Sequence, residues 1–267
     1  MNQEKDIYIN NKKVHYSISG KGKPVALIHG FAEDGAVWKY QRDELAKNYQ
    51  VIIPDLPGSG QSETIVNISI AAMADIIQQV LEAEAITTTV LLGHSMGGYV
   101  SLAFAEKYPA MLAGFGLFHS TAYADTEEKK TARRRSMAFI QTHGSDAFLN
   151  QSSPNLFSTD SRNKQGGMVK ALIDAYKDFD PAALIGYYEA MIQRPDRTAV
   201  LQSFEKPILF MIGKQDNAVP FEHSLEQCKL PQISYIHILE HSGHMGMWEE
   251  VSKSNSALAS FLRDVYV

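Results

Sequence analysis

Short, continuously apolar runs alternate with helical patterns along most of this chain. The runs lie at residues 24–30, 51–55, 90–93, 114–120, 207–213 and 233–240. Strands rich in Val, Ile and Leu without polar alternation are typical of parallel sheets that helices cover on both faces. Helical patterns fill several intervals between the runs, as in residues 69–85, where Ser69 is a good N-cap. This alternation predicts the α/β class, with a mostly parallel sheet that has eight strands when the two strands of an amino-terminal hairpin are added to the six runs.

The first segment of the chain has a different pattern. DIYIN and NKKVHYSIS alternate polar and apolar residues on either side of Asn10-Asn11. Period-two alternation around such a turn predicts an antiparallel hairpin.

Residues 121–200 interrupt the alternation, because they hold several helical patterns and no convincing strand. We expect this interval to be a helical cap inserted into an α/β core made of residues 1–120 and 201–267. No linker in the sequence is long enough to separate two independent domains.

Composition excludes several classes of function. The chain has 267 residues and a formal net charge of −5, with no basic stripe, so we expect no nucleic-acid partner. The basic residues Lys129, Lys130 and Arg133–Arg135 follow Glu127-Glu128 at helical spacing, which favours a solvated helix face. Cys228 is the single cysteine, the amino-terminal segment is polar, and no run of eighteen apolar residues occurs. We therefore expect a cytoplasmic protein without disulfide or membrane span, a monomer or small homo-oligomer.

Ser95 lies in the stretch GHSMG, between the apolar run VLLG and a helical pattern. A serine exposed at a strand-to-helix turn needs glycines at the positions two before and two after it, here Gly93 and Gly97, to relieve crowding. The next residue, Met96, begins the helix, where a free backbone N–H favours negative charge. The stretch predicts a nucleophilic serine with an oxyanion donor beside it.

A nucleophilic serine requires a base, an orienting acid and a second oxyanion donor. Asp216 follows the run PILFMIG, and His244 follows the last run, ISYIHILE, with His241 as the competing base. The N–H of Phe31, in the loop after PVALIHG, is the candidate second donor.

Five blocks in this order resemble the α/β-hydrolase fold superfamily: LIHGFAEDGAVW, PDLPGSGQS, GHSMGGYVSLAFAEKYP, PILFMIGKQDNAVP and SGHMGMWEE. The resemblance implies Ser95 as nucleophile, His244 as base and Asp216 as the acid that orients it. It also implies Phe31 and Met96 as oxyanion donors and a helical cap over the sheet. Serine at the turn separates the chain from dehalogenases and epoxide hydrolases, which carry aspartate there.

The expected activity is hydrolysis of a small, largely apolar carboxylic ester or lactone through an acyl-enzyme, without cofactor or metal. The chain is similar to small esterases and 3-oxoadipate enol-lactonase-like enzymes. Carbon–carbon bond hydrolases and a menaquinone-pathway lyase with the same triad remain alternatives, and a non-catalytic ligand sensor is a third. The candidate residues of the substrate pocket are Trp38, His119, Tyr123, Tyr188 and Met191.

Overall fold

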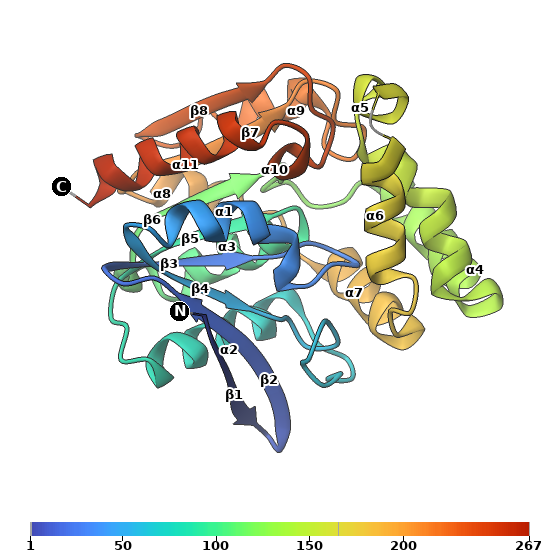
Figure 1. Cartoon of the computed structure of the whole chain (residues 1–267), viewed down its shortest axis with the longest axis horizontal. Coiled ribbons are helices and arrows are strands. Elements are labelled where there is room, and N and C mark those ends of the chain that lie inside the picture. The colour runs from blue at the N-terminus through green and yellow to red at the C-terminus, as the bar shows by residue number, and fades with distance from the viewer. Residues whose placement is uncertain (1, 165, 267) are drawn as a thin grey trace.

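A computed structural model describes residues 2–164 and 166–266, which form a single sheet with helices on both faces (Figure 1). The strands are β1 Gln3–Ile9, β2 Lys12–Ser19, β3 Lys23–Ile28, β4 Tyr49–Pro54, β5 Thr89–His94, β6 Leu112–Phe118, β7 Ile208–Gly213 and β8 Ser234–Leu239. They lie in the order β1-β2-β4-β3-β5-β6-β7-β8. Pairing is antiparallel between β1 and β2 and between β2 and β4, and parallel from β4 onwards. The prediction of an eight-stranded, mostly parallel sheet is confirmed.

The hairpin predicted at the start of the chain is present. Strands β1 and β2 pair antiparallel, and Asn10 and Asn11 join them with φ angles of 51° and 62°. Two consecutive residues with positive φ are what a tight two-residue hairpin requires, and asparagine accepts that conformation more readily than most residues.

The helices that cover the sheet follow the predicted intervals. Helices α1 and α11 contact one another on one face, and α2 packs against α3 on the other (Figure 1). The hydroxyl of Ser69 accepts a hydrogen bond from the N–H of Ala72 at 3.1 Å and caps α2 as expected. The bounds in the core are η1 Gly35–Trp38, α1 Lys39–Leu45, α2 Ile70–Ala83, α3 Met96–Lys107, η2 Pro109–Met111, α9 Phe221–Gln227, α10 Gly246–Glu249 and α11 Val251–Val265.

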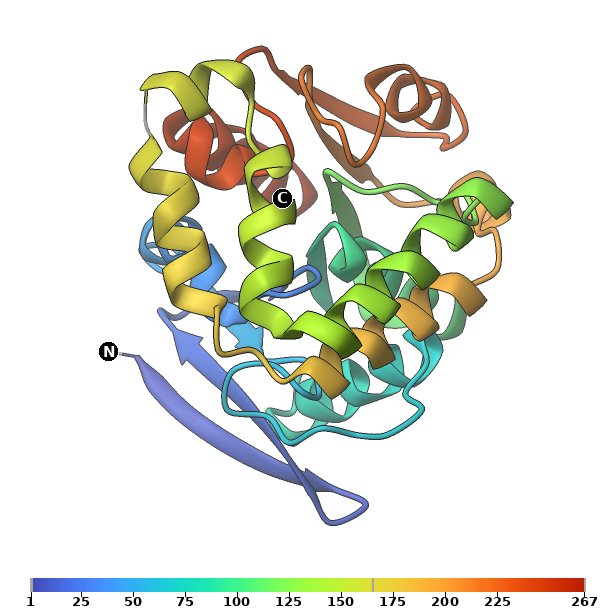
Figure 2. The same cartoon turned by 90° about the vertical axis from the view of Figure 1, so that its right-hand side faces the viewer.

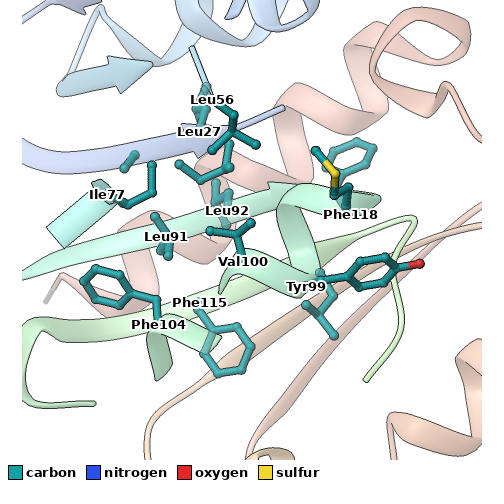
Figure 3. Close-up of a cluster of buried hydrophobic side chains, with 14 of the residues drawn as sticks. Leu27, Leu56, Ile77, Leu91, Leu92, Tyr99, Val100, Phe104, Phe115 and Phe118 are labelled. Atoms are coloured by element: carbon teal, nitrogen blue, oxygen red, sulfur yellow. The ribbon is translucent and has the colours of Figure 1, made fainter. Parts of the chain in front are cut away.

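The core is centred on β5 and α3. Figure 3 shows Val100 and Phe104 of α3 packed towards Leu91 of β5 and Phe115 of β6, and all four side chains are fully buried. Because α3 begins directly after Ser95, this packing holds that residue at the end of a central strand and the start of an anchored helix.

Between β6 and β7 the chain forms helices beside the ends to which the parallel strands point (Figures 1 and 2). Their bounds are α4 Glu127–Ser152, η3 Ser153–Leu156, α5 Thr159–Lys164, α6 Gly166–Tyr176, α7 Pro181–Gln193 and α8 Thr198–Ser203. Helix α4 bends at Gly144, whose φ of 80° and ψ of 175° are not helical. Figure 2 shows the first half of α4 (green) lying along α7 (orange) and its second half (yellow-green) beside α6 (yellow). The assignment of residues 121–200 as a cap stays a prediction.

Strand β8 differs from the expectation of burial on both faces. It is an edge strand, and Ile236 and Ile238 are 46% and 38% exposed. Its other face packs inwards, where Tyr235 meets Phe261 of α11 edge to face. An unbroken apolar run therefore does not distinguish a central strand from an edge strand. None of the helices formed by the described residues is both long and apolar enough to cross a membrane.

Candidate active site

Ser95 occupies a strained turn between β5 and α3. Its φ of 50° and ψ of −114° lie where non-glycine residues are rare. A Cβ atom on Gly93 would lie 2.2 Å from the carbonyl oxygen of Gly97, and one on Gly97 would lie 2.3 Å from the carbonyl oxygen of Ile28. Only glycine fits at both positions, which is the reason that the sequence pattern implied.

The two candidate oxyanion donors lie on either side of this turn. Met96 is the first residue of α3, so its N–H has no partner within the helix. Phe31 follows Gly30 in the loop after β3, and a Cβ atom on Gly30 would lie 3.2 Å from Cβ of Ser95. The structure thus brings the Phe31 loop against Ser95, as the sequence implied, while the role of both N–H groups stays a prediction.

His244 and Asp216 form a buried pair at the ends of β8 and β7. Nδ1 of His244 lies 2.8 Å from Oδ2 of Asp216, and the other carboxylate oxygen accepts the N–H groups of Ala218 and Val219. Burial alone would raise the pKa of Asp216, but the charge of His244 and contacts with both neighbouring histidines lower it well below the usual range. Asp216 is therefore an anion that can hold the imidazole of His244 in one orientation.

His241, the competing base, points away from the site. Its side chain is 68% exposed and lies 3.9 Å from Asp160, and its N–H donates to Glu250. His244 is buried and its backbone carbonyl is 2.9 Å from Nε2 of His94, the residue before Ser95. Of the two histidines, His244 is therefore the one that contacts the residue before Ser95.

His119, a candidate pocket residue, lies behind Asp216. Its Nδ1 is 3.3 Å from Oδ2 of Asp216, and the N–H groups of Gly213 and Gly246 point at its two ring nitrogens from 3.1 and 3.2 Å. Burial lowers the pKa of His119 to about 4, so the ring is neutral. One ligand atom each of His119, Asp216 and His244 fall within 4.8 Å of one another. This is the donor set nearest to a metal site among the described residues, and the hydrogen bonds already account for its closeness.

A second buried acid–histidine pair was missed from the sequence. Oε2 of Glu33 lies 2.9 Å from Nδ1 of His94 and accepts the N–H of Gly30 at 2.7 Å. Burial would raise the pKa of Glu33 and lower that of His94, but their mutual attraction reverses both shifts. The two residues are 61 positions apart, and the blocks HGFAED and GHSMG contain no signal that joins them.

The candidate pocket residues do not lie together. Tyr188 stacks on Phe31, with ring centroids 4.3 Å apart, and both line a cavity of about 100 Å³ together with Phe148. Tyr123 instead lines a separate, more open groove of about 470 Å³. Trp38 is fully buried in the core, where its ring meets Phe118 edge to face at 5.4 Å. Met191 is also buried. The cavity and the groove are lined by other residues, and not by Trp38, His119 or Met191.

The basic cluster at the start of α4 is only partly a solvated face. Arg134 is exposed as expected, but Arg133 turns inwards and donates to Asp125 at 2.6 Å. Asp125 also pairs with Arg194 at 2.9 Å, and the guanidinium of Arg194 lies 3.8 Å from the centre of the Tyr99 ring. Burial raises the pKa of Tyr99, but the two arginines outweigh that effect and lower it. The expectation for Arg133 was wrong because Asp125, outside the helix, draws it into the interior.

Comparisons with known proteins agree with this architecture. Residues 23–117 match a family described as alpha/beta hydrolase fold. An esterase from Thermogutta terrifontis, solved with malate bound, has a TM-score of 0.92 and 29% sequence identity, with coverage of 99% of this chain and 100% of that one. The enol-lactonase from Burkholderia xenovorans LB400 has a TM-score of 0.90 at 20% identity, covering 97% and 100% of the two chains. That second likeness concerns the fold alone.

A curated relative extends the comparison to sequence along nearly the whole chain. The 2-hydroxy-6-oxononadienedioate/2-hydroxy-6-oxononatrienedioate hydrolase of Paraburkholderia phymatum is 26% identical over 263 residues, which cover 94% of this chain and 91% of the relative. Together with the fold and the serine turn, these findings confirm the resemblance that the five sequence blocks carry. The chain belongs to the α/β-hydrolase fold superfamily of enzymes.

Proposed function

We propose that this protein is a serine hydrolase that cleaves a small carboxylic ester or lactone through an acyl-enzyme. The observation that carries the proposal is the strained turn of Ser95 beside a buried His244–Asp216 pair. A serine hydroxyl becomes a nucleophile when a neighbouring base takes its proton, and the base works when a third group orients it. All three residue types are present, in elements that end at the same edge of the sheet.

In the proposed first step His244 takes the hydroxyl proton of Ser95 as the serine oxygen attacks the substrate carbonyl. The N–H groups of Phe31 and Met96 then donate to the oxyanion of the tetrahedral intermediate. Collapse of that intermediate breaks the ester bond, and His244 gives its proton to the departing alcohol oxygen. Water then attacks the acyl-enzyme with His244 as base, which releases the carboxylic acid and restores the hydroxyl of Ser95.

The size of the substrate is proposed from the cavity beside Phe31. Its volume is about 100 Å³, and its wall includes Phe148, Leu172 and Tyr188. A space of that size with apolar walls accepts a short acyl chain and excludes a long one. We therefore propose a short, largely apolar acyl group.

The names of two relatives bear on the reaction in different ways. The similar Thermogutta structure is titled an esterase, which supports ester cleavage. The curated relative from Paraburkholderia is named a hydrolase of oxononadienedioate compounds, which favours carbon–carbon bond hydrolysis as the second candidate function. Both reactions use water to cleave a bond next to a carbonyl carbon, so only substrates can separate them.

The test is a comparison of kcat/KM across p-nitrophenyl esters from acetate to octanoate, simple lactones and a vinylogous 1,5-diketone. We expect turnover of the acetate and butyrate esters, a sharp decline for longer chains, and labelling of the enzyme once by a fluorophosphonate, at Ser95. Higher kcat/KM for the diketone than for every ester would replace the ester proposal with the carbon–carbon one. Absence of turnover of all three classes, with labelling intact, would favour a ligand-binding role.

A further inference from the structure

The buried pair of Glu33 and His94 has a protonation state that its contacts dictate. Nε2 of His94 faces the carbonyl oxygen of His244 at 2.9 Å, and a carbonyl oxygen only accepts, so Nε2 must carry hydrogen. Nδ1 faces Oε2 of Glu33, which already accepts the N–H of Gly30. The lowered pKa of Glu33 and the raised pKa of His94 place the proton between them on Nδ1, so the ring is an imidazolium with a donor at each nitrogen.

The surroundings of His94 strengthen this ion pair. The side chains of His94 and Glu33 are 1% and 4% exposed, so water does not screen the pair. Trp38 and Phe118 meet the His94 ring edge to face at 6.3 and 6.4 Å. Near the His94 ring lie the rings of His244 at 4.9 Å and His119 at 6.1 Å, with the carboxylate of Asp216 beyond them, and His29 and Tyr176 lie near Glu33. Burial lowers the pKa of His94, but Glu33 and Asp216 raise it, and His94 in turn outweighs the burial of Glu33 and lowers the pKa of that carboxyl.

The pair joins three segments that are far apart in the chain. Glu33 holds the N–H of Gly30, directly before Phe31, and His94 directly precedes Ser95. His94 also holds the backbone carbonyl of His244 across 150 positions of sequence. A Cβ atom on Gly30 would lie 2.8 Å from Nδ1 of His94 and 2.9 Å from Oε2 of Glu33, so the loop can approach the pair only because residue 30 is glycine.

We propose that Glu33 and His94 are positioning residues, a buried bridge that sets the Phe31 loop and the His244 loop around Ser95. This inference rests on the proposed function, since it assigns the bridge to the geometry of the oxyanion donor and the base. Neither residue touches the reacting atoms in this role. Misplacement of a catalytic group by about 1 Å costs on the order of 100-fold in rate, so the bridge acts on kcat.

The bridge also makes the site sensitive to alkaline pH. An imidazole that has lost one proton can donate to Glu33 or to the His244 carbonyl, but not to both. The site therefore loosens when the pair gives up its shared proton. Replacement of Glu33 by glutamine removes the charge that holds this proton, so the alkaline decline in kcat/KM must begin at lower pH in the variant.

The experiment compares wild type with Glu33→Gln, and with His15→Gln as a matched control. His15 also sits between two carboxylates, at 2.7 Å from Asp6 and 2.9 Å from Glu4, but it lies on β2 away from Ser95. Fluorophosphonate titration gives the active fraction, and kcat and KM for p-nitrophenyl acetate are measured from pH 6 to 10. We expect Glu33→Gln to lower kcat by about 10- to 100-fold with KM within threefold, and to shift the alkaline decline to lower pH. His15→Gln should match wild type in kcat, in KM and in the pH at which the alkaline decline begins.

Two readouts separate failure of the bridge from failure of the proposed function. Wild type without ester turnover overturns the proposed function, whereas an active wild type with an unaffected Glu33→Gln variant overturns only the bridge. If Glu33→Gln does not fold, ¹⁵N NMR of the imidazole nitrogens in wild type at pH 8 decides. Two protonated nitrogens in His94 support the bridge, and a singly protonated ring overturns it.

Discussion

Substitution of His119 by asparagine should reduce the sensitivity of folding to acid. The ring of His119 is fully buried, and two backbone N–H groups, from Gly213 and Gly246, point at its nitrogens. The neutral ring donates from Nδ1 to Asp216 and accepts the N–H of Gly246 at Nε2, so a second proton, on Nε2, would face the N–H of Gly246. Asparagine suits the site because His119 has a φ of 50°, a conformation that asparagine accepts more readily than most residues.

The magnitude follows from the pKa of His119, which burial lowers to about 4 in the folded state. In the unfolded chain histidine titrates near 6.5, so between these values the unfolded state binds more protons than the folded state. The free energy of unfolding therefore falls as pH drops below about 6.5, by about 1.4 kcal/mol per pH unit, until about pH 4. Between pH 8 and pH 5 this residue alone removes about 2 kcal/mol, from 1.5 pH units at that slope.

The assay is urea unfolding of wild type and His119→Asn at pH 8 and pH 5, followed by far-ultraviolet circular dichroism. The lost ring contacts destabilise the variant at both pH values, but its loss of stability between pH 8 and pH 5 should be smaller by about 2 kcal/mol. His241→Asn serves as the control, because that exposed side chain should leave the pH dependence unchanged. Equal losses of stability in wild type and His119→Asn would refute the assignment of a neutral, acid-sensitive His119.

Further predictions concern the proposed chemistry. Ser95→Ala should fold normally and lose about 10⁴-fold or more in kcat, and His244→Ala should show the same loss. His241→Ala should keep at least about a tenth of wild-type activity. Steady-state ester assays measure all three variants, and equally large losses for both histidine variants would give His241 a role. Asp216→Asn should lose about 10³- to 10⁴-fold, because the His244 imidazole loses its orienting anion, and a nearly silent variant would move the acid elsewhere. Tyr188→Ala enlarges the cavity beside Phe31 and should raise kcat/KM for hexanoate relative to acetate esters; an unchanged chain-length profile would remove that cavity from the substrate pocket.

The parts of this molecule that the sequence predicts well are those that depend on local patterns. Continuous apolar runs predicted the parallel strands, and Asn10-Asn11 predicted the hairpin, because period and turn chemistry act over a few residues. Ser95, Asp216 and His244 were placed by the strands that they follow, and the structure brings the latter two within hydrogen-bond distance.

The parts that were missed depend on contacts between distant segments. In the sequence, Glu33 is a polar residue in a loop and His94 is part of a strand. Their pairing can be predicted only when β3 and β5 are known to be neighbours in the sheet. Arg133 has the spacing of a surface residue on α4, and only the position of Asp125 turns it inwards. Trp38 and Tyr188 are both large aromatic residues, and periodicity does not tell a core position from a cavity wall.

The bond between His94 and the backbone of His244 has a consequence for the synthesis of the protein. It spans 150 positions and connects the central strand β5 to a loop that is synthesised long after that strand. Strands β1 to β6 end at Phe118 and can begin to associate while the chain is still growing. The His244 loop and α11 come after them, so at that stage the nascent chain has the serine turn without the proposed base. In the proposed mechanism, cleavage at Ser95 therefore has to wait until residue 244 has been synthesised, and we expect a chain released before that residue to be inactive however well its first six strands fold.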